Sequence, residues 1–134
     1  MSPVIEVDDV VVVRPVEASH IGVGDIVAFY QGQNVVVHRV IGKTQPKGRL
    51  YFRQMGDACP SSRKFPEKNL IGKVMIIKKK KQEIYLDSPL QVLKNRAIGW
   101  RLFLYDILDR KFLLPFKRGH WRTIRLLWRF LWDW

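Results

Sequence analysis

The stretch Val35-Val36-Val37-His38-Arg39-Val40-Ile41 is an apolar and mostly β-branched run. Such a run predicts a buried or half-buried β-strand with one imidazole set into it. That imidazole, His38, has two possible roles: it can simply hydrogen-bond to a neighbour, or it can serve as a general base held on a rigid strand. Because the ordinary pKa of histidine is about 6.5, a base of this kind is competent near neutral pH. The remaining sequence bears on which role applies.

Size and charge limit the class of protein. The chain has 134 residues, of which 47% are hydrophobic, so we expect one domain with a modest core and not a disordered polymer. Lysine and arginine number 24 against 12 aspartate and glutamate, and the formal charge of +12 points to an anionic partner, either membrane lipid or nucleic acid. Cys59 is the single cysteine, which excludes an intrachain disulfide and a cysteine-rich zinc site.

Three further absences are expected from the sequence. His20, His38 and His120 fall in separate expected elements without ligand spacing, so we expect no metal and no cofactor. The first residues show no charged segment followed by an apolar one, so no signal peptide is expected. No run of about 18 uncharged apolar residues occurs, so no helix is expected to span a bilayer.

Turn residues recur at short intervals between apolar runs as far as residue 87. This spacing predicts short strands over residues 10–13, 26–30, 35–41, 50–55, 70–77 and 83–86, with 61–69 as a loop. The lysine run at 78–81 is typical of a solvated hairpin arm. The expected fold class is therefore mainly β, a small coiled antiparallel sheet or barrel over residues 1–87.

The pattern changes at Ser88-Pro89, a favourable N-cap followed by a favourable first helical residue. Gly99 weakens the helix that follows by about 1 kcal/mol relative to alanine, and Pro115 ends or kinks it. We expect residues 88–134 to form an amphipathic helical tail on the β-domain. The apolar residues of its first part recur at helical spacing: Leu90, Leu93, Ala97, Trp100, Leu104, Ile107 and Leu108.

Residues 116–134 are rich in tryptophan, leucine and arginine, and their charges fall on one stripe at steps of three or four. Two interpretations remain open. The segment can pack as a helix on the barrel or on the preceding helix, or it can lie in the plane of a membrane, with tryptophans at headgroup depth and arginines toward anionic lipid. The second interpretation predicts a peripherally membrane-associated protein, with these membrane-binding residues: Trp121, Arg122, Arg125, Trp128 and Arg129. Nucleic acid is not expected as a partner, because bulky aliphatic residues separate the basic ones and no stacking or groove-reading motif is present.

Short motifs follow one another in order along residues 1–77. They are Met1-Ser2-Pro3, Asp8-Asp9 before four valines, Gly24-Asp25-Ile26-Val27-Ala28-Phe29, His38-Arg39-Val40, Phe52 followed by Gly56-Asp57-Ala58, and Gly72-Lys73-Val74. Together they resemble the signal peptidase I family in its broad sense, the serine peptidases that include self-cleaving repressors. The His-Arg-Val motif matches the histidine type of base, found where the bacterial type has lysine. Each motif is weak alone, and the ordered set is fairly specific.

The resemblance implies a sheet of the signal peptidase type and a serine endopeptidase that acts on peptide or preprotein substrates. His38 would be the catalytic base, and Asp57 would accept the imidazole N–H, although an aspartate after Gly56 can also simply cap its own turn. Met1, Val4 and Ile5 would line a small apolar substrate-binding pocket for the side chains that precede the scissile bond.

The sequence departs from the family pattern at three places. The family's nucleophilic serine stands directly before the methionine of the first motif, which here is Met1, and Ser2 occupies a different position of that motif. Asp8 replaces a glycine, and residues 61–63 lack the second aspartate of the histidine type. Either the reading frame was begun at an internal methionine, or the chain is a non-catalytic β-domain that binds a peptide or docks on a membrane. In both cases the chain as given is expected to be inactive.

Overall fold

The computed structural model describes residues 5–6, 8–57 and 61–109. In this part of the chain seven strands precede one α-helix: β1 Val10–Arg14, β2 Ile26–Gln31, β3 Asn34–Thr44, β4 Tyr51–Met55, β5 Ser62–Pro66, β6 Leu70–Lys79, β7 Gln82–Tyr85 and α1 Pro89–Leu108. Short 3-10 turns, Ala18–His20, Pro46–Gly48 and Glu67–Asn69, lie between the strands.

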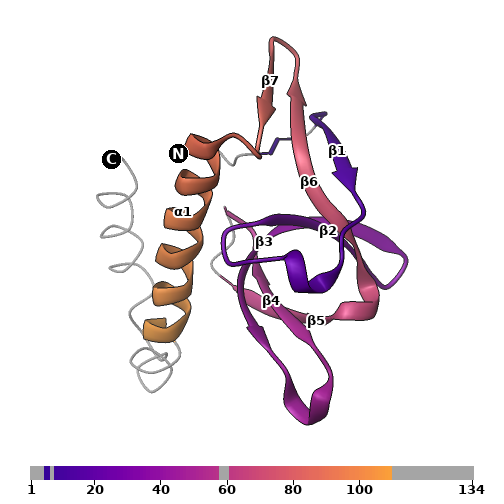
Figure 1. Cartoon of the computed structure of the whole chain (residues 1–134), viewed down its shortest axis with the longest axis vertical. Helices are drawn as coiled ribbons and strands as arrows, with labels where there is room; N and C mark the ends of the chain where they lie inside the picture. The colour runs from indigo at the N-terminus through magenta and orange to yellow at the C-terminus, as the bar shows by residue number, and fades with distance from the viewer. Residues whose placement is uncertain (1–4, 7, 58–60, 110–134) are drawn as a thin grey trace, which may run out of the picture.

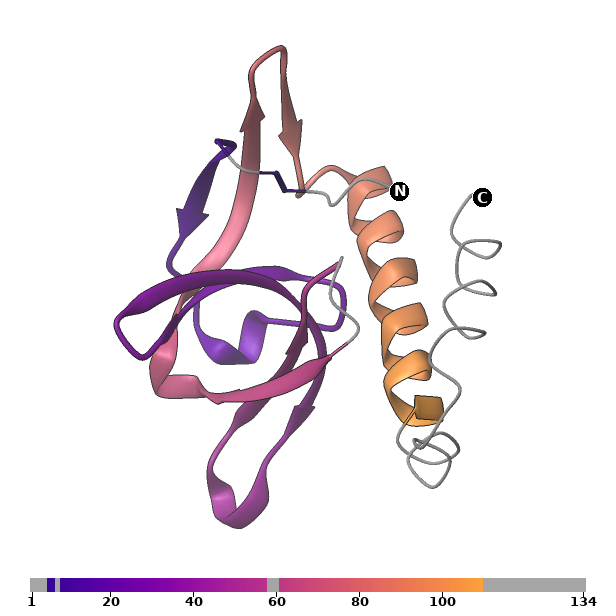
Figure 2. The same ribbon diagram turned by 180° about the vertical axis from the view of Figure 1, so that it is seen from behind.

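All seven strands belong to one antiparallel sheet with the order β1-β6-β2-β3-β4-β5, and β7 adds to β6. Figures 1 and 2 show a strongly curved sheet, with the β3–β4 and β6–β7 hairpins projecting at opposite ends and α1 along one side. The prediction of a mainly β, antiparallel architecture followed by a helix is confirmed. The alternative of a closed barrel is wrong for the described residues, because β1 and β5, the two ends of the strand order, do not pair.

Side-chain alternation along β2 builds two apolar layers. Val27 and Phe29 point into a cluster with Phe52 and Phe65, and the rings of Phe29 and Phe65 stack with centroids 4.0 Å apart. Ile26 points the other way, into a second cluster with residues of β6 and with the segment before α1. Full burial of a phenylalanine of this kind contributes about 1.5–3 kcal/mol. Strand β3 presents His38 to the first layer, where its ring lies near that of Phe29.

Strand β5 was not expected, since residues 61–69 were predicted to be a loop. Its sequence, Ser-Arg-Lys-Phe-Pro, contains one buried apolar residue, Phe65, and therefore lacks the alternation that indicates a strand. The strand forms because Phe65 stands opposite Phe52 of the neighbouring strand β4 and stacks on Phe29 in the core. Pro66 ends it at the edge of the sheet, where no further backbone donor is needed.

The start of α1 agrees with the sequence, and its cap differs in detail. Ser88 stands at the N-cap position and Pro89 follows as the first helical residue. The Ser88 hydroxyl donates to the Tyr85 carbonyl oxygen at 3.2 Å and makes no hydrogen bond to the helix amides. Ser88 therefore joins the helix to the end of β7.

Gly99 has a packing role that compensates for its low helix propensity. A Cβ atom at Gly99 would lie 2.6 Å from both the Cα and the backbone nitrogen of Gly24, so α1 crosses the β1–β2 connection at the closest possible approach. Gly24 also has a φ of +97°, a conformation that favours glycine. The pair of glycines allows the helix to approach the sheet at this point.

The face of α1 that contacts the sheet differs from the face that its apolar spacing suggests. The buried residues are Asn95, Gly99, Leu102 and Asp106, and Leu102 packs with Ile41 and Met55. Most of the apolar series beginning at Leu90 is exposed. The predicted division at residue 87 falls between β7 and α1, yet α1 is packed on the β-domain through this polar and small-residue face.

The predicted second part of the tail, residues 116–134 with Trp121, Arg122, Arg125, Trp128 and Arg129, lies outside the described residues, and its membrane role stays a prediction. Within the described part of the chain, no helix combines the length and the hydropathy needed to cross a membrane.

Candidate functional site

His38 lies in the middle of β3, on the same face as Val36 and Val40, and its ring centroid is 6.3 Å from that of Phe29. The imidazole is half-buried. Its Nδ1 atom is 2.5 Å from Oε1 of Gln54, a buried residue of β4. Gln54 stands opposite Val40 in the β3–β4 register, so the two side chains meet diagonally across neighbouring strands.

The contact with Gln54 determines the tautomer of the imidazole. A carboxamide oxygen only accepts hydrogen bonds, so the Nδ1 atom of His38 carries the proton and donates it to Oε1 of Gln54. The lone pair then lies on Nε2, the nitrogen of the ring that would remove a proton from a nucleophile. The arrangement therefore holds the ring at Nδ1 and leaves Nε2 available as the proton-accepting nitrogen.

Asp57 does not fill the role that the resemblance implies. Its carboxylate accepts two hydrogen bonds from Arg39, from Nε at 2.8 Å and from Nη2 at 2.8 Å, in a parallel two-point ion pair. The imidazole of His38 finds its partner in Gln54 instead. The reason is geometric, because successive residues of β3 point to opposite faces, and Asp57 lies on the Arg39 face.

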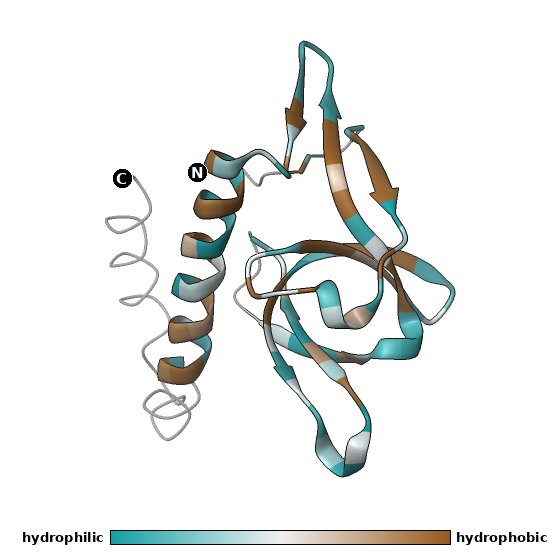
Figure 3. Ribbon diagram, viewed as in Figure 1, coloured by the Kyte–Doolittle hydropathy of each residue, from teal (hydrophilic) through white to brown (hydrophobic). Residues whose placement is uncertain are grey.

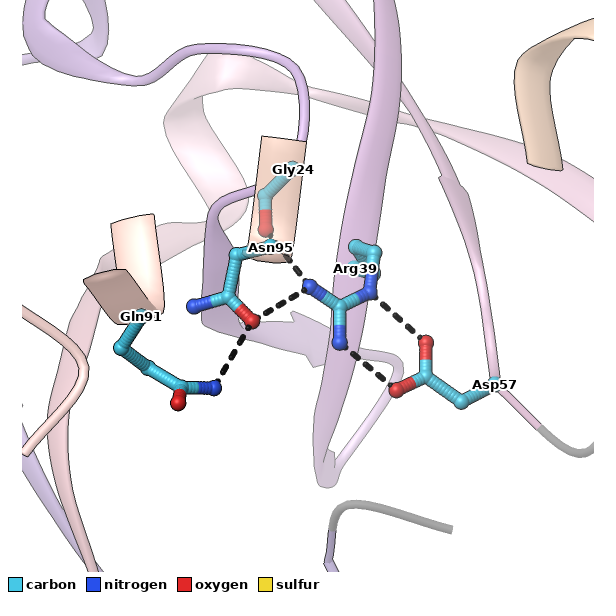
Figure 4. A network of polar contacts seen from close by, with 5 residues as sticks. All are labelled: Gly24, Arg39, Asp57, Gln91 and Asn95. Atoms are coloured by element: carbon cyan, nitrogen blue, oxygen red, sulfur yellow. Dashed lines mark hydrogen bonds and ion pairs between the residues drawn. The ribbon is translucent and has the colours of Figure 1, made fainter. Parts of the chain in front are cut away.

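Arg39 is the polar centre of the fold and is 1% exposed. Its Nη1 atom donates to the Gly24 carbonyl oxygen at 2.8 Å and to Oδ1 of Asn95 at 3.1 Å, and Gln91 donates to the same oxygen at 3.4 Å. Figure 4 shows the guanidinium between Asp57 on one side and the Gly24 turn and α1 on the other. The planar fork of arginine serves three elements at once, which a lysine could not do. The strand that carries His38 is thereby tied to the turn before β2, the end of β4 and helix α1.

A second polar link joins α1 to the sheet near its C-terminal end. Asp106 accepts from Nη1 of Arg53 at 2.9 Å and from the Ser62 hydroxyl at 2.5 Å. Asp25, in the turn before β2, accepts from the Gly22 amide at 2.8 Å and pairs with Lys73 at 2.8 Å. These pairs fix the surroundings of the site.

The three predicted substrate-binding residues are not brought together with His38 in the described chain. Met1 and Val4 lie outside the described residues. Ile5 packs against the second apolar cluster, together with Val37 of β3. Because Val37 precedes His38 on the strand, the two side chains point to opposite faces, and Ile5 lies on the face away from the imidazole.

Sequence reasoning missed Gln54 and Asn95. Gln54 lies two residues after buried Phe52, on the same face of β4. A polar residue at a position expected to be buried was the available signal. Asn95 gave none, because its contact with Arg39 spans 56 residues of sequence. No group of three or more histidine, cysteine, aspartate or glutamate residues is arranged to hold a metal ion in residues 5–6, 8–57 and 61–109.

Comparison of the chain with protein-family models, with curated proteins and with solved structures finds no match.

Proposed function

We propose that this chain is the β-domain of a signal-peptidase-like serine endopeptidase, with His38 as general base. The observation that carries the proposal is the hydrogen bond from Nδ1 of His38 to Gln54, which leaves Nε2 as the basic atom of a half-buried imidazole. The proposal requires a nucleophilic serine directly before Met1 and takes peptide or preprotein segments as substrates. Met1 and Val4 enter the proposal as part of the wall of a small apolar pocket, whereas Ile5 is left out because it packs on the face of the sheet away from His38.

The proposed reaction is acyl transfer. The serine hydroxyl attacks the scissile carbonyl carbon while Nε2 of His38 takes its proton, and the imidazolium then protonates the leaving amine as the peptide C–N bond breaks. The same nitrogen next removes a proton from water as the water attacks the ester carbonyl, and it returns that proton to the serine oxygen as the C–O bond breaks. Throughout, Gln54 holds the ring through Nδ1. Gln54 orients the imidazole through this hydrogen bond. Because Gln54 is neutral, it stabilises the imidazolium less than a carboxylate would.

Asp57 takes part in this proposal indirectly. Its ion pair with Arg39 anchors the residue next to His38, so the pair sets the position of β3 relative to α1 and β4. Asp57 is therefore proposed as a positioning residue that acts through Arg39.

The test compares two chains, the sequence as given and the same sequence preceded by Gly-x-Ser. A fluorophosphonate probe should label the extended chain at the added serine and leave the chain as given unlabelled. His38→Ala in the extended chain should abolish labelling, while His20→Ala, at an exposed position of the Ala18–His20 turn, should leave it unchanged. An extended chain that melts cooperatively and is never labelled contradicts the proposal, as does labelling at Ser2 of the original chain.

The second candidate is a non-catalytic β-domain that binds a peptide or docks on a membrane. It is favoured by one observation: the partner of the His38 imidazole in the described residues is a carboxamide and not a hydroxyl. The two candidates separate when a peptide is added to the serine-extended chain, because a binding domain would retain the peptide without cleaving it.

We also propose peripheral association with an anionic membrane surface through residues 116–134. The support is the sequence pattern of tryptophans opposite an arginine stripe, together with the net charge of +12. Deleting residues 116–134 should lower the fraction of the protein that sediments with anionic vesicles. A deletion that binds vesicles as well as the full chain would remove this segment from the interaction.

A further inference from the structure

Helix α1 carries a row of large apolar side chains that the sheet does not cover. Each is more than half exposed: Leu90 77%, Leu93 67%, Trp100 54%, Leu104 57% and Leu108 53%. With exposed Ala97 between them, they follow one another at steps of three and four residues, which places them on one side of the helix. We call this row the α1 outer stripe.

The outer stripe is not needed to hold α1 on the β-domain. Leu93 and Asn95, like Trp100 and Leu102, are two residues apart and so about 200° apart around the helix axis. Asn95 and Leu102 are buried against the sheet, where the contacts with Arg39, Ile41 and Met55 are made. The stripe therefore points away from the domain, and hydrophobic segments appear along the ribbon of α1 in Figure 3.

Within α1, the exposed charged residues beside the outer stripe have one sign. Lys94 lies beside it at one border and Arg96 at the other, and both are exposed. The single acidic residue within α1 is Asp106, which is 5% exposed and bound to Arg53. The outward half of the helix is thus an apolar row between cations, about 30 Å long for 20 residues.

We propose that the α1 outer stripe docks in the plane of an anionic lipid bilayer, with Lys94 and Arg96 at the lipid phosphates. Trp100 has the amphipathic ring that favours headgroup depth, and the flanking cations match the charge of such a surface. This surface is separate from the peptidase site and does not depend on the proposed function.

Charge also argues against the two other possible occupants. A second copy of α1 would bring its own Lys94 and Arg96 against those of the first. Residues 116–134 carry several arginines and one aspartate, so covering the stripe with that segment would add positive charge next to Lys94 and Arg96. An anionic surface is the occupant that neutralises these groups.

The test follows Trp100 in the full-length chain. The sequence has five tryptophans, so replacing Trp121, Trp128, Trp132 and Trp134 with phenylalanine leaves Trp100 as the sole reporter. Vesicles containing phosphatidylglycerol should shift its emission to the blue, and brominated lipid should quench it, while pure phosphatidylcholine vesicles should have much less effect.

Variants measure the contribution of each part. Leu93→Ser with Leu104→Ser should weaken partition into anionic vesicles at least about tenfold. Lys94→Gln and Arg96→Gln should each weaken it about fivefold at low salt, with a smaller effect at high salt. Tyr30→Ser with Val35→Ser is the matched control, since these residues are 52% and 57% exposed on the β2–β3 hairpin, and it should change partition little. All variants should melt near the parent temperature because the altered residues are exposed.

Three results would overturn the proposal. Trp100 emission that is already blue without lipid and shielded from acrylamide at every protein concentration would show that the chain covers its own stripe. Shielding of Trp100 from acrylamide that grows with protein concentration would show that a second copy of the chain covers the stripe. Vesicle binding without any change at Trp100 would show that the membrane contact lies elsewhere.

Discussion

Replacing Asp57 with alanine tests whether this residue is structural or serves the imidazole. In the folded protein Asp57 accepts two hydrogen bonds from Arg39, both at 2.8 Å, and Arg39 is 1% exposed. Without the carboxylate, a buried guanidinium keeps its bonds to Gly24 and Asn95 and loses its counter-charge. Breaking a buried ion pair from one side typically destabilises a protein by about 3–5 kcal/mol.

The lower end of that range applies here. The Asp57 side chain is 19% exposed, so water can reach the vacated side of Arg39 and replace part of the lost interaction. We therefore expect Asp57→Ala to lower the free energy of unfolding by about 3 kcal/mol. The exposed pair between Lys78 and Glu83, at 3.2 Å with side chains 48% and 43% exposed, is the control, and Glu83→Ala should cost less than about 1 kcal/mol.

Urea denaturation followed by circular dichroism measures both variants, with the slope checked for unchanged two-state behaviour. If Asp57 served only to orient His38, its removal would leave stability almost untouched. A loss below about 1 kcal/mol for Asp57→Ala, equal to that of the surface control, would refute the account of the Arg39 network.

Three other outcomes follow from the structure. In the serine-extended chain, Gln54→Leu should lower kcat about tenfold with KM unchanged, since one orienting hydrogen bond of about 1.4 kcal/mol is lost, and an unchanged kcat would show that the contact is incidental. Gly99→Ala should lower the melting temperature, because the added Cβ atom would lie 2.6 Å from facing backbone and overpacking costs about 1–3 kcal/mol, although helix propensity alone predicts a gain. The pKa of Asp9 is lowered, mainly by the hydrogen bond from the Glu6 amide and also by the one from Lys79. The ionised Asp9 carboxylate therefore stabilises the fold above about pH 4, and this contribution is lost as the pH falls through the lowered pKa. Amide exchange in β1 should accelerate across that acid range, and Asp9→Asn should be fast at every pH if the account holds.

The sequence predicted most of the strands because their signals are local. Runs such as Val10 to Val13 and Val35 to Ile41 contain enough β-branched residues to identify β1 and β3 without any tertiary information. Strand β5 has no such signal, since its single core residue, Phe65, is defined by its stacking on Phe29.

The packing of α1 could not be predicted from periodicity. Its apolar series correctly indicated a helix, and the usual rule would place that series against the core. The sheet instead presents two arginines, Arg39 and Arg53, that need partners, and α1 supplies Asn95 and Asp106 to them. The polar face is buried because these pairs form between residues far apart in the sequence. Because the face of α1 with Asn95 and Asp106 is turned toward the sheet, the α1 outer stripe is left exposed.

The candidate site was predicted in part. His38 was identified by its place in an apolar strand and by its motif, whereas its partner Gln54 was not, since the contact depends on the β3–β4 register. Asp57 was expected beside the imidazole and is bound to Arg39 instead.

The measurement that tests the central claim most directly is the kcat/KM of the serine-extended chain on a quenched peptide with small residues before the cleavage site. We predict that His38→Ala lowers kcat/KM by at least about 100-fold, the range for loss of a general base, and leaves the melting temperature near that of the parent. His20→Ala should change kcat/KM by less than about twofold, since its side chain is exposed in the Ala18–His20 turn. A folded His38→Ala variant that cleaves the peptide at the parent rate would contradict the claim that this imidazole is the base.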